Sequence, residues 1–140
     1  YSMKPFPNTE NPLVLRVDFT DQSAWEEICR MIQAPVGGFY AYVEFLDDPA
    51  YEGVTKEDLQ AIIPRNYNHN FIILVDHIAI SEPGHPLLVV DLSEGSYESF
   101  RAVPSTVQSI ENNLSLANMD FEEFAGSVDE NGVFRGFSEG

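Results

Sequence analysis

The sequence contains one cysteine, and this scarcity constrains both its chemistry and its setting. Cys29 is the single cysteine among 140 residues, so no internal disulfide can form. Such cysteine usage is typical of a reducing compartment, and we expect a cytoplasmic protein. Cys29 falls on the apolar side of a predicted helix. Packing explains it better than nucleophilic chemistry there, because the sequence supplies no adjacent base.

Long apolar runs are also missing. The longest ones cover residues 71–75 and 87–90, far short of the roughly 20 residues that a membrane-spanning helix needs. No charged-then-apolar leader opens the sequence, so no signal peptide is predicted. Tyr1 and Ser2 are compatible with the remnant of an expression tag before a native Met3.

Basic residues are few and dispersed. Seven Lys and Arg stand against 23 Asp and Glu, which gives a formal net charge of −16. Phosphate binding requires clustered cations, so we expect neither a nucleic acid nor an anionic membrane as partner. The acidic surplus fits either simple solubility or a negative face that docks a basic protein, and the sequence leaves both interpretations open.

Standard catalytic signatures are absent as well. The sequence contains no Gly-rich phosphate loop, no G-x-S-x-G, no H-E-x-x-H, no C-x-x-C and no G-x-G-x-x-G. Ordinary nucleotide-binding enzymes, hydrolases with a nucleophile elbow and zinc proteases are therefore poorly supported. We predict no cofactor.

What is present predicts one α/β domain. Hydrophobic residues make up 44% of the chain, enough to fill a core. Apolar periodicity predicts strands at 13–19, 39–46, 71–75, 87–92 and 99–103, helices beginning near 21, 55, 105 and 120, and a closing strand at 133–137. Residues 77–80 are interpreted as a strand extension or a further short strand. Early β-α-β units favour parallel pairing and later hairpins favour antiparallel pairing.

The predicted fold class is therefore α/β (α+β), with a single mixed sheet of about five or six strands and three or four helices packed on it. We place this domain at residues 12–137. Residues 1–11 are polar and rich in proline, and we expect them to form a loose N-terminal arm.

Several segments together resemble a known family. They are Pro35-Val36-Gly37-Gly38-Phe39, Val43 to Tyr51, Leu88 to Leu92, Ile110 to Phe121 and Gly132 to Phe137. With these segments the chain resembles a family of small acidic single-domain bacterial proteins of unknown function. The resemblance implies one domain over most of the chain and carries no activity, cofactor or catalytic residue.

One candidate surface for a partner concentrates acids beside an aromatic residue. An exposed Tyr51 among carboxylates would suit an anchor for a basic partner. The plain alternative is a solvated loop followed by acids in a first helical turn, where they offset the helix dipole. The partner-binding candidates are Asp47, Asp48, Tyr51, Glu52, Glu57 and Asp58.

A second set of candidates could bind a ligand. Asp76 and Asp91 each end an apolar strand and could share a crevice if the two strands were parallel neighbours, although the short connection favours antiparallel pairing. The three histidines are spaced eight residues apart, which matches no standard metal signature, so we predict no metal site. The ligand-binding candidates are Arg65, Tyr67, His69, Asp76, His77, His85 and Asp91.

Three functions remain open at this point. We predict a non-enzymatic interaction module that binds a basic protein, in the manner of immunity proteins or antitoxins. The first alternative is a small enzyme or a ligand- or metal-binding domain with a site near Asp76, His77, His85 and Asp91. The second is a homo-oligomeric structural subunit, which an exposed apolar patch around Phe39, Tyr40 and Tyr42 would favour.

Overall fold

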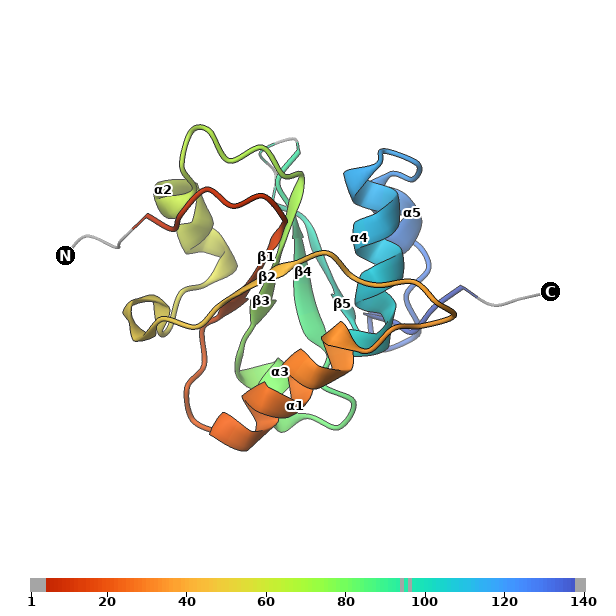
Figure 1. Ribbon diagram of the computed structural model, residues 1–140, viewed down its shortest axis with the longest axis horizontal. Helices are drawn as coiled ribbons and strands as arrows, with labels where there is room; N and C mark the ends of the chain where they lie inside the picture. The colour runs from red at the N-terminus through yellow and green to blue at the C-terminus, as the bar shows by residue number, and fades with distance from the viewer. Residues whose placement is uncertain (1–4, 94, 96, 138–140) are drawn as a thin grey trace.

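A six-stranded sheet with helices on both faces organises the protein, as a computed structural model shows for residues 5–93, 95 and 97–137 (Figure 1). The expected tag remnant at residues 1–2 lies outside the described residues. The elements in chain order are β1 Leu13–Arg16, α1 Gln22–Gln33, β2 Glu44–Leu46, the 3₁₀ turns η1 Pro49–Tyr51 and η2 Lys56–Asp58, α2 Leu59–Ile62, β3 Phe71–Val75, α3 His77–Ser81, β4 Leu87–Asp91, β5 Ser99–Ala102, η3 Pro104–Thr106, α4 Val107–Ser115, α5 Phe121–Ala125 and β6 Val133–Phe134.

The sheet changes from parallel to antiparallel at its centre. Its strand order is β2-β1-β3-β4-β5-β6. β1 pairs in parallel with both β2 and β3, β4 pairs antiparallel with β3 and β5, and β6 is parallel to β5. The prediction of a single mixed sheet is thus confirmed.

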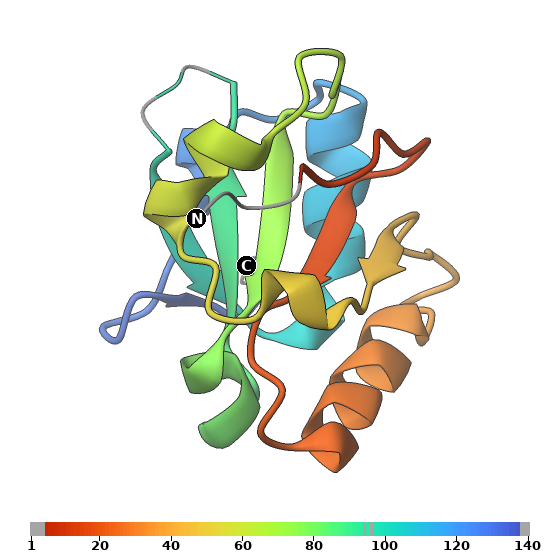
Figure 2. The ribbon, with the colours of Figure 1, turned by 90° about the vertical axis from the view of Figure 1, so that its left-hand side faces the viewer.

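Side chains alternate between two apolar layers along the central strands. On β3, Phe71 and Ile73 contact the layer formed with α1, α3, α4 and α5, whereas Ile72 and Leu74 contact the layer beneath α2. All five residues of β3 are buried, because both faces of a central strand are covered. Figure 2 shows the sheet from the α2 side, with α4 behind it.

The handedness of the crossovers fixes which face each helix covers. β2 lies on one side of β1, and β3 lies on the other. A β-α-β connection in a parallel sheet is almost always right-handed, so connections that run in opposite directions place their helices on opposite faces. Accordingly, α1 and α2 pack in different apolar layers.

Two expected strands differ from those observed. Residues 77–81 form α3 rather than a strand, because Asp76 Oδ1 accepts a hydrogen bond from Ala79 N at 3.1 Å and caps the helix. The strand expected at 39–46 is reduced to Glu44–Leu46, since the residues before it bond to α4 instead of β1. The structure therefore has five α-helices within the described ranges.

The N-terminal arm is not loose over residues 5–11, contrary to expectation. Phe6 is buried, packs its ring edge-on against Tyr67 and donates its backbone N–H to Ile62 O. An apolar side chain that leaves water stabilises the segment carrying it, and the polar and proline-rich sequence around Phe6 obscures this contribution.

A buried carboxylate attaches the segment after α1 to α4. Glu111 is 5% exposed, and its Oε1 accepts hydrogen bonds from Tyr42 N at 2.9 Å and from Asn112 Nδ2 at 2.8 Å. Asn112 Nδ2 also donates to Tyr40 O at 2.9 Å. In Figure 1 this segment, drawn in orange, crosses in front of α4. These bonds replace the strand pairing that residues 39–43 lack.

Glu111→Ala should lower the free energy of unfolding by about 1–3 kcal/mol, because it leaves the Tyr42 N–H without its acceptor. Glu111→Gln keeps an acceptor oxygen and should cost clearly less. Urea unfolding of both variants beside the parent protein measures the difference. Equal losses for Ala and Gln would show that the acceptor role of Glu111 is not what stabilises this contact.

Candidate functional site

The ligand-site candidates at the strand ends lie at opposite edges of the sheet. Asp91 pairs with Phe71 in the antiparallel register of β3 and β4, and Asp76 follows the far end of β3. Five residues of strand separate the two positions, roughly 17 Å. The shared crevice considered for Asp76 and Asp91 is therefore wrong. Arg101 donates to both Asp76 oxygens at 2.8 Å, which explains that carboxylate as a structural ion pair.

The three histidines are also apart, and each contacts a different group. His69 Nε2 lies 2.7 Å from Thr9 O, and His85 Nδ1 lies 2.8 Å from Ala79 O. His77 Nδ1 lies 3.0 Å from Asp18 Oδ2, across the carboxyl ends of β1 and β3. Within the described ranges, no three His, Cys, Asp or Glu side chains are grouped as metal ligands would be.

Tyr51 is not an exposed anchor, contrary to the sequence interpretation. Its side chain is fully buried, and its hydroxyl donates to Pro5 O at 2.9 Å. η1 turns the ring inward, because Asp48 caps that turn by accepting from Ala50 N. An aromatic residue flanked by acids is thus part of the core.

The acids near Tyr51 divide into structural and exposed groups. Asp47 accepts from buried Arg16 at 3.3 Å, and Asp58 completes a capping box with Thr55. Glu52 and Glu57 are exposed. Asp47 is exposed as well, so three of the five predicted carboxylates lie on the surface, and three of the five, Asp47, Asp48 and Asp58, have local structural partners.

The loop candidates are divided in the same way. The Tyr67 hydroxyl accepts from Leu13 N at 3.1 Å, and burial raises the pKa of Tyr67 to about 12. Tyr67 therefore stays neutral and ties its loop to β1, whereas Arg65 is exposed. On α1, burial raises the pKa of Cys29 to about 11, which favours the protonated thiol.

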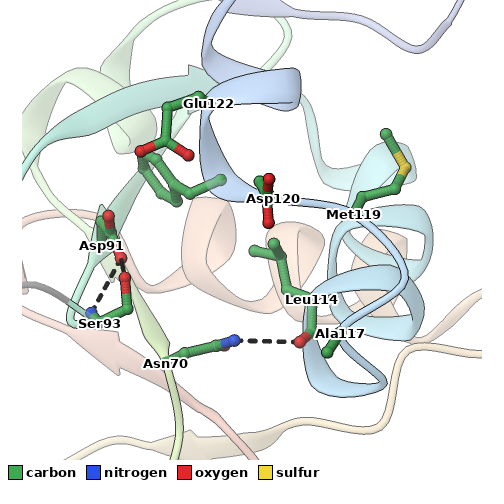
Figure 3. A pocket seen from close by; sticks show the side chains of 9 residues that line it. Asn70, Asp91, Ser93, Leu114, Ala117, Met119, Asp120 and Glu122 are labelled. Carbon is green, nitrogen blue, oxygen red and sulfur yellow. Dashed lines mark hydrogen bonds between the residues drawn. The ribbon is translucent and has the colours of Figure 1, made fainter.

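A pocket combines groups from four parts of the chain, at the edge of the sheet where β4 ends and β3 begins (Figure 3). β4 contributes Asp91, followed by Ser93, and the loop before β3 contributes Asn70. The end of α4 and the start of α5 complete the walls. Its volume is about 260 Å³, and it is lined by Asn70, Asp91, Ser93, Leu114, Ala117, Met119, Asp120, Phe121 and Glu122. We call it the acidic pocket.

The walls of the acidic pocket are held by hydrogen bonds. Asn70 Nδ2 donates to Leu114 O at 3.0 Å and joins the β3 edge to α4 (Figure 3). Asp91 is buried, and its Oδ1 accepts from Ser93 N at 2.9 Å and from Ser93 Oγ at 2.6 Å. These bonds fix the Asp91 carboxylate without neutralising its charge.

The acidic pocket is lined by acids and by several apolar side chains. Among the described residues, three carboxylates, Asp91, Asp120 and Glu122, line it, and no Lys, Arg or His does. In Figure 3, Glu122 extends its carboxylate toward the side where Asp91 lies. Leu114, Met119 and Phe121 contribute apolar atoms to the lining. This arrangement suits a cation carried on an aliphatic stem.

A family model for a domain of unknown function, DUF6924, matches residues 11–137. The chain belongs to the DUF6924 family. No curated protein matches the chain in sequence. The family relationship confirms the resemblance to a family of unknown function.

Sequence reasoning found one of the three carboxylates in this DUF6924 domain's pocket. Asp91 was a candidate, but Asp120 was interpreted as a helix cap and Glu122 was not singled out. Asp120 does occupy the N-cap position of α5, but its side chain makes no capping bond there. A carboxylate at a cap position that makes no cap is a signal only the structure supplies. No helix in the described ranges is long and apolar enough to cross a membrane.

The Asp18 carboxylate of this DUF6924 domain makes the stability of the fold depend on pH. Burial would raise the pKa of Asp18, but hydrogen bonds from Thr20 and the contact with His77 outweigh it and hold the pKa below its usual value. A carboxyl with a lowered folded-state pKa stabilises the fold above its unfolded pKa, and that contribution is lost as the pH falls through the folded value.

Asp18→Asn should therefore destabilise the domain at pH 7, and the difference from the parent should shrink as the solution is acidified below the usual carboxyl range. Urea unfolding at several pH values measures this difference. A gap that stays constant down to pH 2 would contradict the assigned role of Asp18.

Proposed function

We propose that this DUF6924 domain is a protein-interaction module that binds a basic partner and takes one of the partner's lysine or arginine side chains into the acidic pocket. The observation that carries the proposal is a pocket that, among the described residues, is lined by three carboxylates, by no base and by several apolar side chains. Carboxylates recognise a cation by charge-assisted hydrogen bonds, and apolar walls accommodate the methylene stem that precedes it.

The size of the acidic pocket supports a side chain rather than a large cofactor. Small-molecule sites are typically about 300–1,000 Å³ and bury most of their ligand. At about 260 Å³ the pocket lies below that range. A single long basic side chain projecting from a larger surface fits this volume better than a nucleotide-sized molecule.

The remaining charges of the domain support a basic partner. Four of its five arginines pair with carboxylates in the described ranges: Arg16 with Asp47, Arg30 with Glu27, Arg101 with Asp76 and Arg135 with Asp129. Twelve acidic residues are exposed within the described ranges, and Asp47 is the one among them that takes part in these four arginine pairs. Such a field steers a basic protein toward the domain and accelerates its encounter, as immunity-type inhibitors of nucleases require.

The structure does not bring together the residues on which the alternative of a small enzyme mainly depended. That alternative needed Asp76 and Asp91 in one crevice, and the antiparallel pairing of β3 and β4 separates them. The contact between His77 and Asp18 remains at the carboxyl ends of β1 and β3, but Asp18 also accepts from Thr20 N and Thr20 Oγ1 and thus serves the turn after β1.

The acidic pocket is tested by titrating the ¹⁵N-labelled full chain with a short lysine-rich peptide. We expect chemical-shift changes at the Ser93 backbone amide and the Asn70 side-chain amide, and we expect them to fade as salt is raised, because ions screen exposed charges. The double variant Asp120→Asn, Glu122→Gln should weaken binding by about tenfold or more, since charge-assisted hydrogen bonds contribute about 1.5–3 kcal/mol each.

The matched control is Glu52→Gln with Glu57→Gln, which removes two charges from the exposed acids near η2 and should change the affinity much less. A peptide that binds both double variants equally weakly would show that it is attracted by the net charge of the domain in general. That result would contradict the acidic pocket as the recognition site. An affinity that does not depend on salt would contradict the proposal altogether.

A further inference from the structure

Two stretches of the chain that lie side by side carry almost no charge, and together they form one surface. It is formed by residues 34–43, after α1, and by the exposed side of residues 102–119, which include α4; we call it the neutral face. The chain has 30 charged residues in 140, so these 28 positions would hold six at the average frequency. They hold one, Glu111, and it is buried.

The two stretches of the neutral face are held together although they are distant in sequence. Tyr42 N donates to Glu111 Oε1, and Asn112 Nδ2 donates to Tyr40 O. The single charged side chain is thus turned inward to fix the backbone, and the outer surface is left to uncharged groups. This arrangement builds a defined surface rather than a free loop.

Exposed apolar side chains concentrate on the neutral face. Five of the seven large apolar side chains exposed within the described ranges belong to it: Val36, Phe39, Tyr40, Tyr42 and Leu116. Leu116 is 71% exposed and Phe39 is 62% exposed. Between them runs a groove of about 420 Å³, where Phe39 and Leu116 are joined by the amides of Gln108, Asn112 and Asn113. Contiguous exposed apolar surface of this kind marks interaction sites.

We infer that the neutral face is the surface on which two copies of this chain associate. In a symmetric dimer the same patch of both copies forms the contact, so every carboxylate in the patch is present twice within one interface. For a chain with net charge −16, most of the surface is unsuited to self-contact for this reason. The neutral face avoids the repulsion, and it offers aromatic rings and amides, which pack and hydrogen-bond well at interfaces.

Dimerisation on the neutral face and binding of a basic peptide respond oppositely to salt. Salt screens the mutual repulsion of two acidic chains, so the dimer dissociation constant should fall as salt is raised. Salt also screens the attraction of the basic peptide, so that affinity should weaken. The sign of the salt effect therefore separates this inference from the function proposed above.

Sedimentation of the full chain at increasing concentration, in low and in high salt, tests the inference. We expect a species of twice the 15.7 kDa chain mass that becomes more abundant in high salt. Leu116→Asp should raise the dimer dissociation constant about tenfold or more, because it replaces an apolar side chain by a charge in the contact surface of each copy. Phe39→Ser, which adds no charge, should also weaken the dimer.

Ile78→Asp is the matched control, because Ile78 is an exposed apolar residue on α3, away from the neutral face. It adds the same charge and should leave the dimer intact. A chain that remains monomeric at every concentration and salt would overturn the inference, as would a dimer that Ile78→Asp weakens as much as Leu116→Asp. A monomer that binds a different protein on this face would rule out the second copy as its occupant.

Discussion

The antiparallel pairing of β4 with β3 decides which chemical groups can meet in this protein. Had β4 run parallel to β3, the carboxylates that follow the two strands would lie at the same edge of the sheet. Instead Asp76 pairs with Arg101 at one edge, and Asp91 comes to the other edge beside Asn70. The chain then returns through α4, and this brings Asp120 and Glu122 to Asp91. The antiparallel direction of β4 thus separates Asp76 from Asp91 and places Asp91 in the acidic pocket.

Charge is distributed over the surface so that different faces can take different partners. The acidic pocket and the acids around it attract cations, whereas the neutral face lacks the carboxylates that keep two copies apart. Glu111 shows how the fold maintains this difference, because its carboxylate is buried and bonded to the Tyr42 backbone. The net charge alone would hide this division, since it describes the whole chain and not its faces.

The sequence alone does not predict the strand order or the register, but it does predict much of the local structure. The helix starts near 21 and 55 and the strand at 71–75 follow from short-range patterns, and the structure confirms them. The interpretations of Tyr51 and of residues 77–80 are wrong for different reasons: the Tyr51 hydroxyl is bound by Pro5, which is distant in sequence, whereas α3 begins with a local Asp76 cap that the apolar pattern does not reveal. The acidic pocket could be predicted only in part, because Asp91 and Glu122 are distant in sequence and meet only through the fold.

The acidic pocket and the neutral face meet at the turn that follows α4. Leu114, Ala117 and Met119 line the acidic pocket, whereas Leu116 lies on the neutral face. Ala117 has a φ of 57°, a left-handed conformation that few residues other than glycine adopt readily, so the direction of this turn is set by its surroundings. A basic side chain that presses on Ala117 and Met119 therefore acts on the backbone that also positions Leu116. Because coupling between two binding sites is reciprocal, any effect of dimerisation on the affinity of the acidic pocket must equal the effect of the bound partner on dimerisation.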